Sequence, residues 1–173
     1  MPIFEFGFSG LPTKPDGSPQ LGARQVPIPQ ALQQCGPCIP VQISIAAKVA
    51  AALQKVGSAA PPPQNGLALI DTGATISGVD ARAVQALGLQ PIGVKKVFTA
   101  RGAAQQPVYA ATFAFPNTNI PAINFGELLG VDLADQRIQL IGNQPLIAVI
   151  GREILANFLL IYNGRMARFT LAF

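Results

Sequence analysis

Apolar and polar residues alternate with a period of two along much of this chain, a pattern typical of β-strands. The alternation is clear at 2–8, which contains three Phe residues, and at 39–46. Further strand patterns lie later in the chain, at 66–71, 94–100, 107–115, 123–131, 138–141, 145–150, 158–162 and 166–173. The connections at 101–106 and 163–164 each contain Gly and predict two β-hairpins.

Helical patterns are few and short. We expect helices at 47–56, 80–87 and 152–156, and a Gly follows each of the first two, as is usual at a helix end. Asp80 stands where the second helix needs an N-cap. Because strands dominate, the pattern predicts an all-β barrel or sandwich with a few short helices.

The first 39 residues differ from the remainder. Beyond the strand pattern at 2–8 they hold many Pro and Gly residues and no core pattern, which predicts an extended, irregular arm. We therefore expect an arm at 1–39 and a folded domain at 40–173. The arm could wrap over the domain, wrap over a partner, or be a removable pro-segment.

Composition narrows the function. The 173 residues are 50% hydrophobic and carry a net charge of +4 that is scattered along the chain. Without a clustered basic face, nucleic-acid binding is not expected. The absence of His excludes Ser-His-Asp and Cys-His catalysis and any His-ligated metal site within the chain. Two Cys residues cannot make a disulfide-rich scaffold.

The N-terminal residues and the lengths of the apolar runs indicate where in the cell the protein is expected. The first residues lack the basic and apolar regions of a signal peptide, and no apolar run approaches about 18 residues. We therefore expect a cytoplasmic protein without a membrane span. Richness in Ala, Gly and Pro suggests a bacterial source.

Two motifs point to a catalytic site. Residues 66–75 read Gly-Leu-Ala-Leu-Ile-Asp-Thr-Gly-Ala-Thr, and residues 146–152 read Leu-Ile-Ala-Val-Ile-Gly-Arg. An Asp-Thr-Gly triplet by itself is ordinary turn chemistry. Together with the hairpin pattern at 97–109 between them, however, the two motifs resemble those of retroviral-type (retropepsin-like) aspartic proteases, in particular bacterial single-domain members. The resemblance covers about residues 41–173.

The resemblance implies a fold and an activity. The fold would be the acid-protease closed β-barrel, a single lobe with a few short helices that forms a two-fold homodimer. Such enzymes hydrolyse peptide bonds with two carboxylates that share one proton around a water. This chain has one Asp-Thr-Gly, at Asp71, so the second carboxylate must come from Asp71 of a second chain. The resemblance thus implies an aspartic endopeptidase that acts on extended peptides and needs no metal and no cofactor.

The resemblance also assigns roles to individual residues. Asp71 would activate the water and protonate the leaving amine, and Thr72 would form a hydrogen bond across the dimer axis. Support for the active-site loop is implied for Thr72, Gly73 and Gly151. Contact with substrate is implied for Gly73, Ala74, Phe98, Arg101 and Gly102.

One position departs from the family. Many viral relatives have an Asp directly after the Asp-Thr-Gly-Ala run, and it pairs with the Arg of the second motif. Here that position is Thr75, so we expect Arg152 either to have another partner or to be a solvated residue at a helix start.

Other interpretations stay open. The chain could be a catalytically silent dimer of the same fold, used for binding or assembly. Residues 35–38 read Cys-Gly-Pro-Cys, a redox tetrapeptide of thioredoxins, but the β-like segment after it favours a simple turn. A disulfide within the tetrapeptide or between two chains is an alternative on oxidation. The Phe residues near both ends could serve the core or, slightly favoured, a dimer interface.

Overall fold

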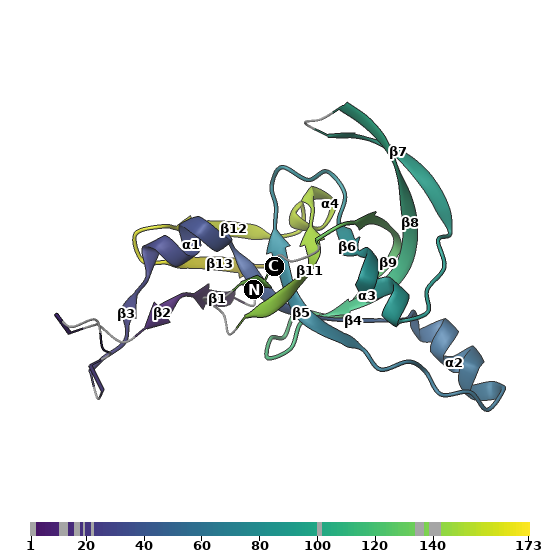
Figure 1. Ribbon diagram of the computed structural model, residues 1–173, viewed down its shortest axis with the longest axis horizontal. Helices are drawn as coiled ribbons and strands as arrows, with labels where there is room; N and C mark the ends of the chain where they lie inside the picture. The colour runs from purple at the N-terminus through teal and green to yellow at the C-terminus, as the bar shows by residue number, and fades with distance from the viewer. Residues whose placement is uncertain are drawn as a thin grey trace.

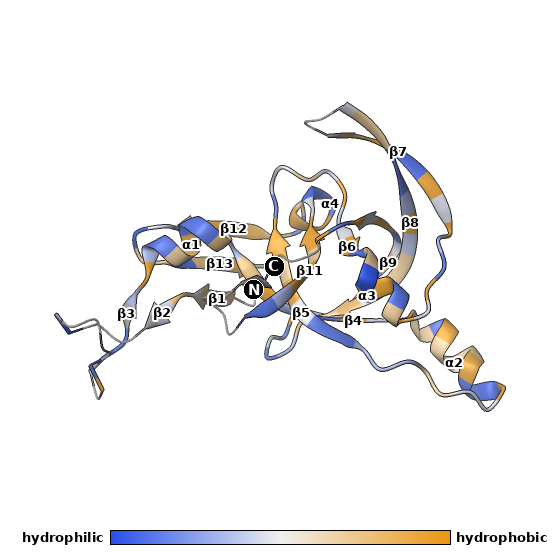
Figure 2. Cartoon of the chain, in the orientation of Figure 1, coloured by the Kyte–Doolittle hydropathy of each residue, from blue (hydrophilic) through white to orange (hydrophobic). Residues whose placement is uncertain are grey.

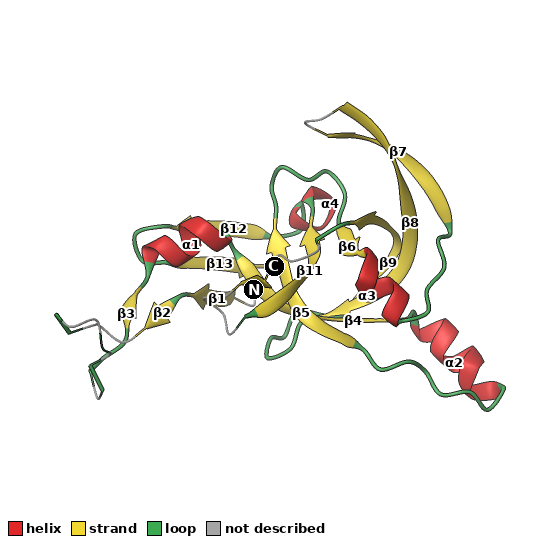
Figure 3. Cartoon of the chain, viewed as in Figure 1, coloured by secondary structure: helices red, strands yellow, loops and turns green. Residues whose placement is uncertain are grey.

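The computed structural model describes residues 3–10, 14–15, 18, 20–21, 23–99, 102–133, 137–138 and 143–173. It is mostly β, with mixed sheets and a few short helices, as the alternation predicts (Figures 1 and 3). The strands are β1 (Ile3–Gly7), β2 (Ser9–Gly10), β3 (Val26–Pro27), β4 (Cys38–Ser44), β5 (Gln64–Ile70), β6 (Gly78–Asp80), β7 (Gly93–Thr99), β8 (Gly102–Ala114), β9 (Ile123–Val131), β10 (Arg137–Ile138), β11 (Gln144–Ile150), β12 (Leu159–Asn163) and β13 (Arg168–Ala172). The helices are α1 (Pro29–Cys35), α2 (Ala47–Lys55), α3 (Ala81–Ala86) and α4 (Arg152–Leu155).

The largest sheet positions both motifs. Its pairing order is β10-β11-β5-β4-β8-β9-β6, with β7 on β8, and β6 pairs in addition with β11. Strands β5 and β11 run parallel, with Ile70 opposite Ile150. Figure 2 shows that both strands are hydrophobic toward their ends, and Leu67, Ala68, Ala148 and Ile150 are buried. The residues that follow the two strands therefore leave the sheet side by side.

The N-terminal segment packs on the rest of the chain. Strand β1 pairs antiparallel with β13, which also pairs with β12, in a three-stranded sheet. Helix α1, which the Pro-rich composition did not predict, buries Ala31 and Leu32 in the same core as the later strands. Pro29 is tolerated there because it begins the helix. The prediction of an extended, irregular arm without a core pattern is therefore wrong at α1.

The terminal Phe residues serve the core. Phe6 stacks on Phe169 with ring centroids 5.2 Å apart, and Phe4 stacks on Phe173 at 6.1 Å. Phe8 and Phe169 are buried. Within a single chain these rings already pack on one another and on the core, as the core interpretation expects, and the dimer-interface interpretation stays a prediction.

The hairpin formed by β7 and β8 is longer than the sequence predicts. Phe98 lies opposite Ala103 and Thr99 opposite Gly102, so the predicted connection at 101–106 is wrong: residues 102–106 belong to β8. This part of β8 is largely exposed, and a strand that faces water on both sides lacks the apolar alternation that reveals strands. The hairpin extends away from the body of the sheet (Figure 1).

Candidate active site

Asp71 follows β5 directly and is half-buried. Its backbone N–H donates to the carbonyl of Ile150 at the end of β11 (3.0 Å), which ties the two motifs together at this point. One carboxylate oxygen, Oδ1, accepts from the N–H of Gly73 at 2.7 Å. A Cβ on residue 73 would lie 3.0 Å from that oxygen, so Gly73 permits the close approach. Within the described part of the chain, no protein donor contacts Oδ2.

Gly151 lies beneath this loop. Its N–H donates to the buried hydroxyl of Ser77 (2.9 Å). A Cβ here would lie 2.7 Å from the backbone carbon of Ile76 and 2.9 Å from the nitrogen of Ser77. Only Gly lets the two chain segments pass this closely.

Arg152 holds the loop from outside. Its Nη1 donates to the carbonyl of Thr72 (3.1 Å), and its Nη2 donates to the hydroxyl of Thr75 (2.8 Å). Its backbone N–H donates to the carbonyl of Ala74 (2.9 Å). Arg152 thus has another partner, the carbonyl of Thr72, as one of the two expectations required, and it contacts residue 75 as well. A hydroxyl accepts this hydrogen bond as a carboxylate would, without forming an ion pair.

Two residues that hold this loop, Ser77 and Glu153, were not predicted from the sequence. Ser77 is fully buried; its N–H donates to Oε1 of Glu153 at 2.6 Å, and its carbonyl accepts from Leu129 of β9 at 3.0 Å. Ser77 thus joins three segments to the loop. The signal for Glu153 was weak, since an acidic residue at the first turn of a short helix is common.

A groove opens in front of Asp71. It has a volume of about 480 Å³, and its lining includes the loop residues Gly73, Ala74 and Thr75 with Asp71. Residues of the hairpin also line it, including Phe98, which is 82% exposed. The fold thus places a carboxylate and an exposed aromatic side chain around one open space.

The remaining predicted site residues occupy different positions. Thr72 is exposed, and its carbonyl is held by Arg152. Gly102 begins β8 with a φ of +110°, a left-handed conformation that suits Gly at a hairpin end. Arg101 lies outside the described residues. Asp71, Gly73, Ala74 and Phe98 are therefore brought together, and Gly151 supports them from below.

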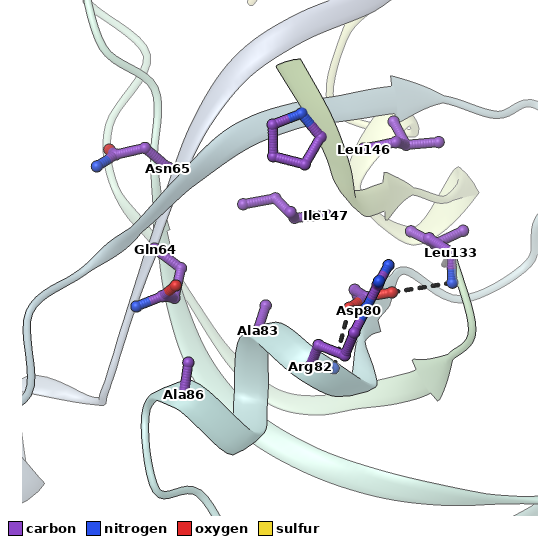
Figure 4. A pocket seen from close by; sticks show the side chains of 10 residues that line it. Gln64, Asn65, Asp80, Arg82, Ala83, Ala86, Leu133, Leu146 and Ile147 are labelled. Atoms are coloured by element: carbon purple, nitrogen blue, oxygen red, sulfur yellow. Dashed lines mark hydrogen bonds and ion pairs between the residues drawn. The ribbon is translucent and has the colours of Figure 1, made fainter. Parts of the chain in front are cut away.

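A second pocket is shown in Figure 4. It has a volume of about 320 Å³ and contains Asp80. Both oxygens of this buried carboxylate are engaged: Oδ1 accepts from the backbone N–H and Nε of Arg82, and Oδ2 accepts from the N–H of Leu133. Asp80 caps α3, as the sequence predicts. Its carboxylate is thus committed to structure.

The environment of the two cysteines does not favour redox chemistry. Cys35 ends α1, and Cys38 begins β4 and donates its S–H to the carbonyl of Cys35 (3.2 Å). Burial, with the neighbouring Cys35 as a smaller cause, raises the pKa of Cys38 to about 12, and burial raises the pKa of Cys35. A reactive thiol needs a lowered pKa, usually at a helix N-terminus. The tetrapeptide here is a turn at a helix C-terminus.

The described residues contain no group of three or more His, Cys, Asp or Glu side chains arranged to hold a metal ion. None of their helices is long and apolar enough to cross a membrane.

No family model matches the chain, and no curated protein matches it in sequence. Its function must therefore be inferred from the residues of the site.

Proposed function

We propose that this protein is an aspartic endopeptidase that hydrolyses peptide bonds as a homodimer of acid-protease barrels. The observation that carries the proposal is the placement of Asp71. It lies at the end of a buried strand, on a loop held by Gly151 and Arg152, and it faces an open groove. A half-buried carboxylate in a concave site with few other polar groups is typical of a catalytic centre.

The sheet topology supports a barrel. The pairings run from β11 through β5, β4, β8, β9 and β6 and return to β11. A sheet whose strands pair in a circuit has no free edge within the circuit. In the acid-protease barrel that we propose, Asp71 and Gly151 stand at one end of this circuit.

The chemistry requires a second carboxylate. Among the described residues that line the groove, Asp71 is the only acid. Two carboxyl groups close together share one proton, so one is ionised and the other protonated. The ionised Asp71 would take a proton from water as the water oxygen attacks the scissile carbonyl carbon. The protonated Asp71 of the second chain would donate to the carbonyl oxygen. When the C–N bond breaks, the Asp71 that took the proton from water would pass it to the leaving nitrogen, and a hydroxyl of the intermediate would return a proton to the other Asp71.

The three-stranded sheet offers a surface for the second chain. Its order is β1-β13-β12, so within the described residues β12 is an edge strand. Leu159 and Ile161 on this strand are 53% and 51% exposed, and Tyr162 is exposed as well. An apolar edge strand favours pairing with another chain. Symmetric pairing at β12 is therefore our candidate for the dimer contact.

The test is cleavage of a mixed peptide library by the wild-type protein and by Asp71→Asn, at mildly acidic and at neutral pH. Glu127→Gln is the matched control, because Glu127 is an exposed acid on β9 outside the groove. We expect cuts by the wild type and the control and none by Asp71→Asn. Light scattering on each variant establishes whether it is a dimer. No cleavage by a folded dimer would overturn the proposal and favour the alternative, a silent dimer used for binding or assembly.

A further inference from the structure

A positively charged side chain lines the same groove as Asp71. Lys96 on β7 lines the groove, two residues before Phe98. Residues two apart on a strand point to the same face. The ammonium nitrogen of Lys96 lies 5.7 Å from the centroid of the Phe98 ring, within the range of a cation–π contact. Lys96 and Phe98 thus form one feature, a cation beside an exposed aromatic ring.

The neighbouring Lys95 provides an internal contrast. Lys95 forms an ion pair with Glu127, with Nζ and Oε2 2.6 Å apart. It does not line the groove. In the described part of the chain, Lys96 has no carboxylate partner. Of the two adjacent lysines, the one that lines the groove is therefore the one without a carboxylate partner among the described residues.

A bound peptide would change the surroundings of Lys96. The other hairpin residues that line the groove, Val97, Phe98 and Gln106, are uncharged. A peptide lying against them would displace water from the ammonium group, and an ion that loses water without gaining a partner is destabilised. A carboxylate on the peptide would provide that partner. An apolar peptide side chain next to it would cover the ring of Phe98.

We propose that Lys96 is a specificity-determining residue that selects peptides with an Asp or Glu side chain adjacent to an apolar one. This inference rests on the proposed function, since it uses the same groove. In a two-fold homodimer each protomer contributes one Lys96. The preference for an acidic side chain therefore falls at two positions, one on each side of the scissile bond.

The experiment uses the full chain and a set of synthetic peptides. Each peptide has the same apolar centre, taken from a sequence the protein cleaves, or designed where none is known, and a single Glu, Gln or Lys is placed in turn at each flanking position. Cleavage by the wild type gives kcat/KM, and fluorescence anisotropy with Asp71→Asn gives binding without cleavage. At about pH 6 the Glu side chain is ionised. We expect about fivefold preference for Glu over Gln at two symmetric positions, as for a favourable pair near the surface. The preference should weaken at high salt.

Three variants sharpen the test. Lys96→Gln should abolish the preference for Glu, and Lys96→Glu should reverse it toward the Lys peptides. Lys95→Gln is the matched control and should keep the wild-type preference. Equal cleavage of Glu and Gln peptides by the wild type, or an unchanged preference in Lys96→Gln, would overturn the role of Lys96 and leave the peptidase proposal intact.

Failure of the peptidase proposal has a different signature. If no peptide is cut but Asp71→Asn still binds Glu peptides in preference to Gln peptides, and Lys96→Gln does not, the selection by Lys96 stands and the proposed hydrolysis fails. If the folded protein neither cuts nor binds any peptide, both proposals are overturned.

Discussion

Two short motifs, Cys-Gly-Pro-Cys at 35–38 and Asp-Thr-Gly at 71–73, lie next to each other in this protein but differ in how accessible their reactive side chains are. The turn at 35–38 contacts the strand that carries Asp71: the N–H of Ile70 donates to the carbonyl of Pro37 at 2.8 Å, and Cys38 pairs with Leu69. Asp71 opens onto a groove of about 480 Å³. Cys38 is 5% exposed and its thiol is hydrogen-bonded. A motif can supply chemistry only where the fold leaves its reactive atoms accessible and suitably ionised.

The largest expected effect is the loss of peptide cleavage when the Asp-Thr-Gly motif, but not the cysteine turn, is substituted. Asp71→Asn should lower kcat/KM for peptide cleavage by at least about 10³-fold, because in the proposed mechanism Asp71 is the group that takes up and releases the proton. The double variant Cys35→Ser with Cys38→Ala should leave kcat/KM unchanged. Peptide cleavage by the purified variants measures both. Loss of activity in the folded cysteine variant would place chemistry at the thiols and refute the comparison.

The next effect concerns the packing under Asp71. Gly151→Ala should lower the free energy of unfolding by about 2 kcal/mol or more, because the new Cβ would overlap the backbone at Ile76 and Ser77. Gly93→Ala is the control, since a Cβ there has nothing within 4 Å. Urea denaturation followed by circular dichroism gives both values. Equal stability of the two variants would mean that the segments beneath the loop move apart easily.

A pH effect is expected from the cysteine turn. The pKa of Cys38 rises from 9.0 to about 12 on folding. Because the folded-state value is the higher one, the stability that comes from the neutral thiol is complete below pH 9 and is lost as the pH rises toward 12. The loss is at most about 1.4 kcal/mol per pH unit. Cys38→Val should flatten this part of the curve, as measured by urea denaturation at several alkaline pH values. Parallel curves for the two proteins would contradict burial of the thiol.

The smallest expected effect concerns the hydrogen bond between Arg152 and Thr75. Thr75→Val removes the hydroxyl that accepts from Nη2 and should cost about 1 kcal/mol of unfolding free energy. Thr75→Ser keeps the hydroxyl and should retain most of the stability. Thermal unfolding of the three proteins measures the difference. A Thr75→Val protein as stable as the wild type and Thr75→Ser would mean that the hydrogen bond from Arg152 contributes nothing measurable to stability.

Much of the fold could be predicted because its strands are half-buried. The pattern at 123–131 matches β9, and the patterns at 66–71 and 145–150 match β5 and β11 within two residues. Helix α1 and the outer part of β8 were missed for opposite reasons. In α1 the Pro and Gly content obscured a short buried helix, while in β8 exposure on both faces removed the alternation.

The candidate site was predictable only in part. Asp71 and Gly151 belong to motifs that can be recognised in the sequence. The partners of Arg152 are not, since Thr72 lies 80 positions away and Thr75 lies 77 away. The roles of Ser77 and Lys96 likewise depend on segments distant in the sequence.

The sequence by itself determined the local elements and the residues able to do chemistry. Strand alternation, turn residues and the Asp-Thr-Gly triplet depend on neighbours a few positions apart, so they can be recognised without a fold. Only the tertiary structure decided which of those residues are accessible. The parallel pairing of β5 with β11 and the presence of hairpin residues in the groove at Asp71 arise from contacts across the whole sheet. These contacts bury the thiol of Cys38 and leave the carboxylate of Asp71 at the groove.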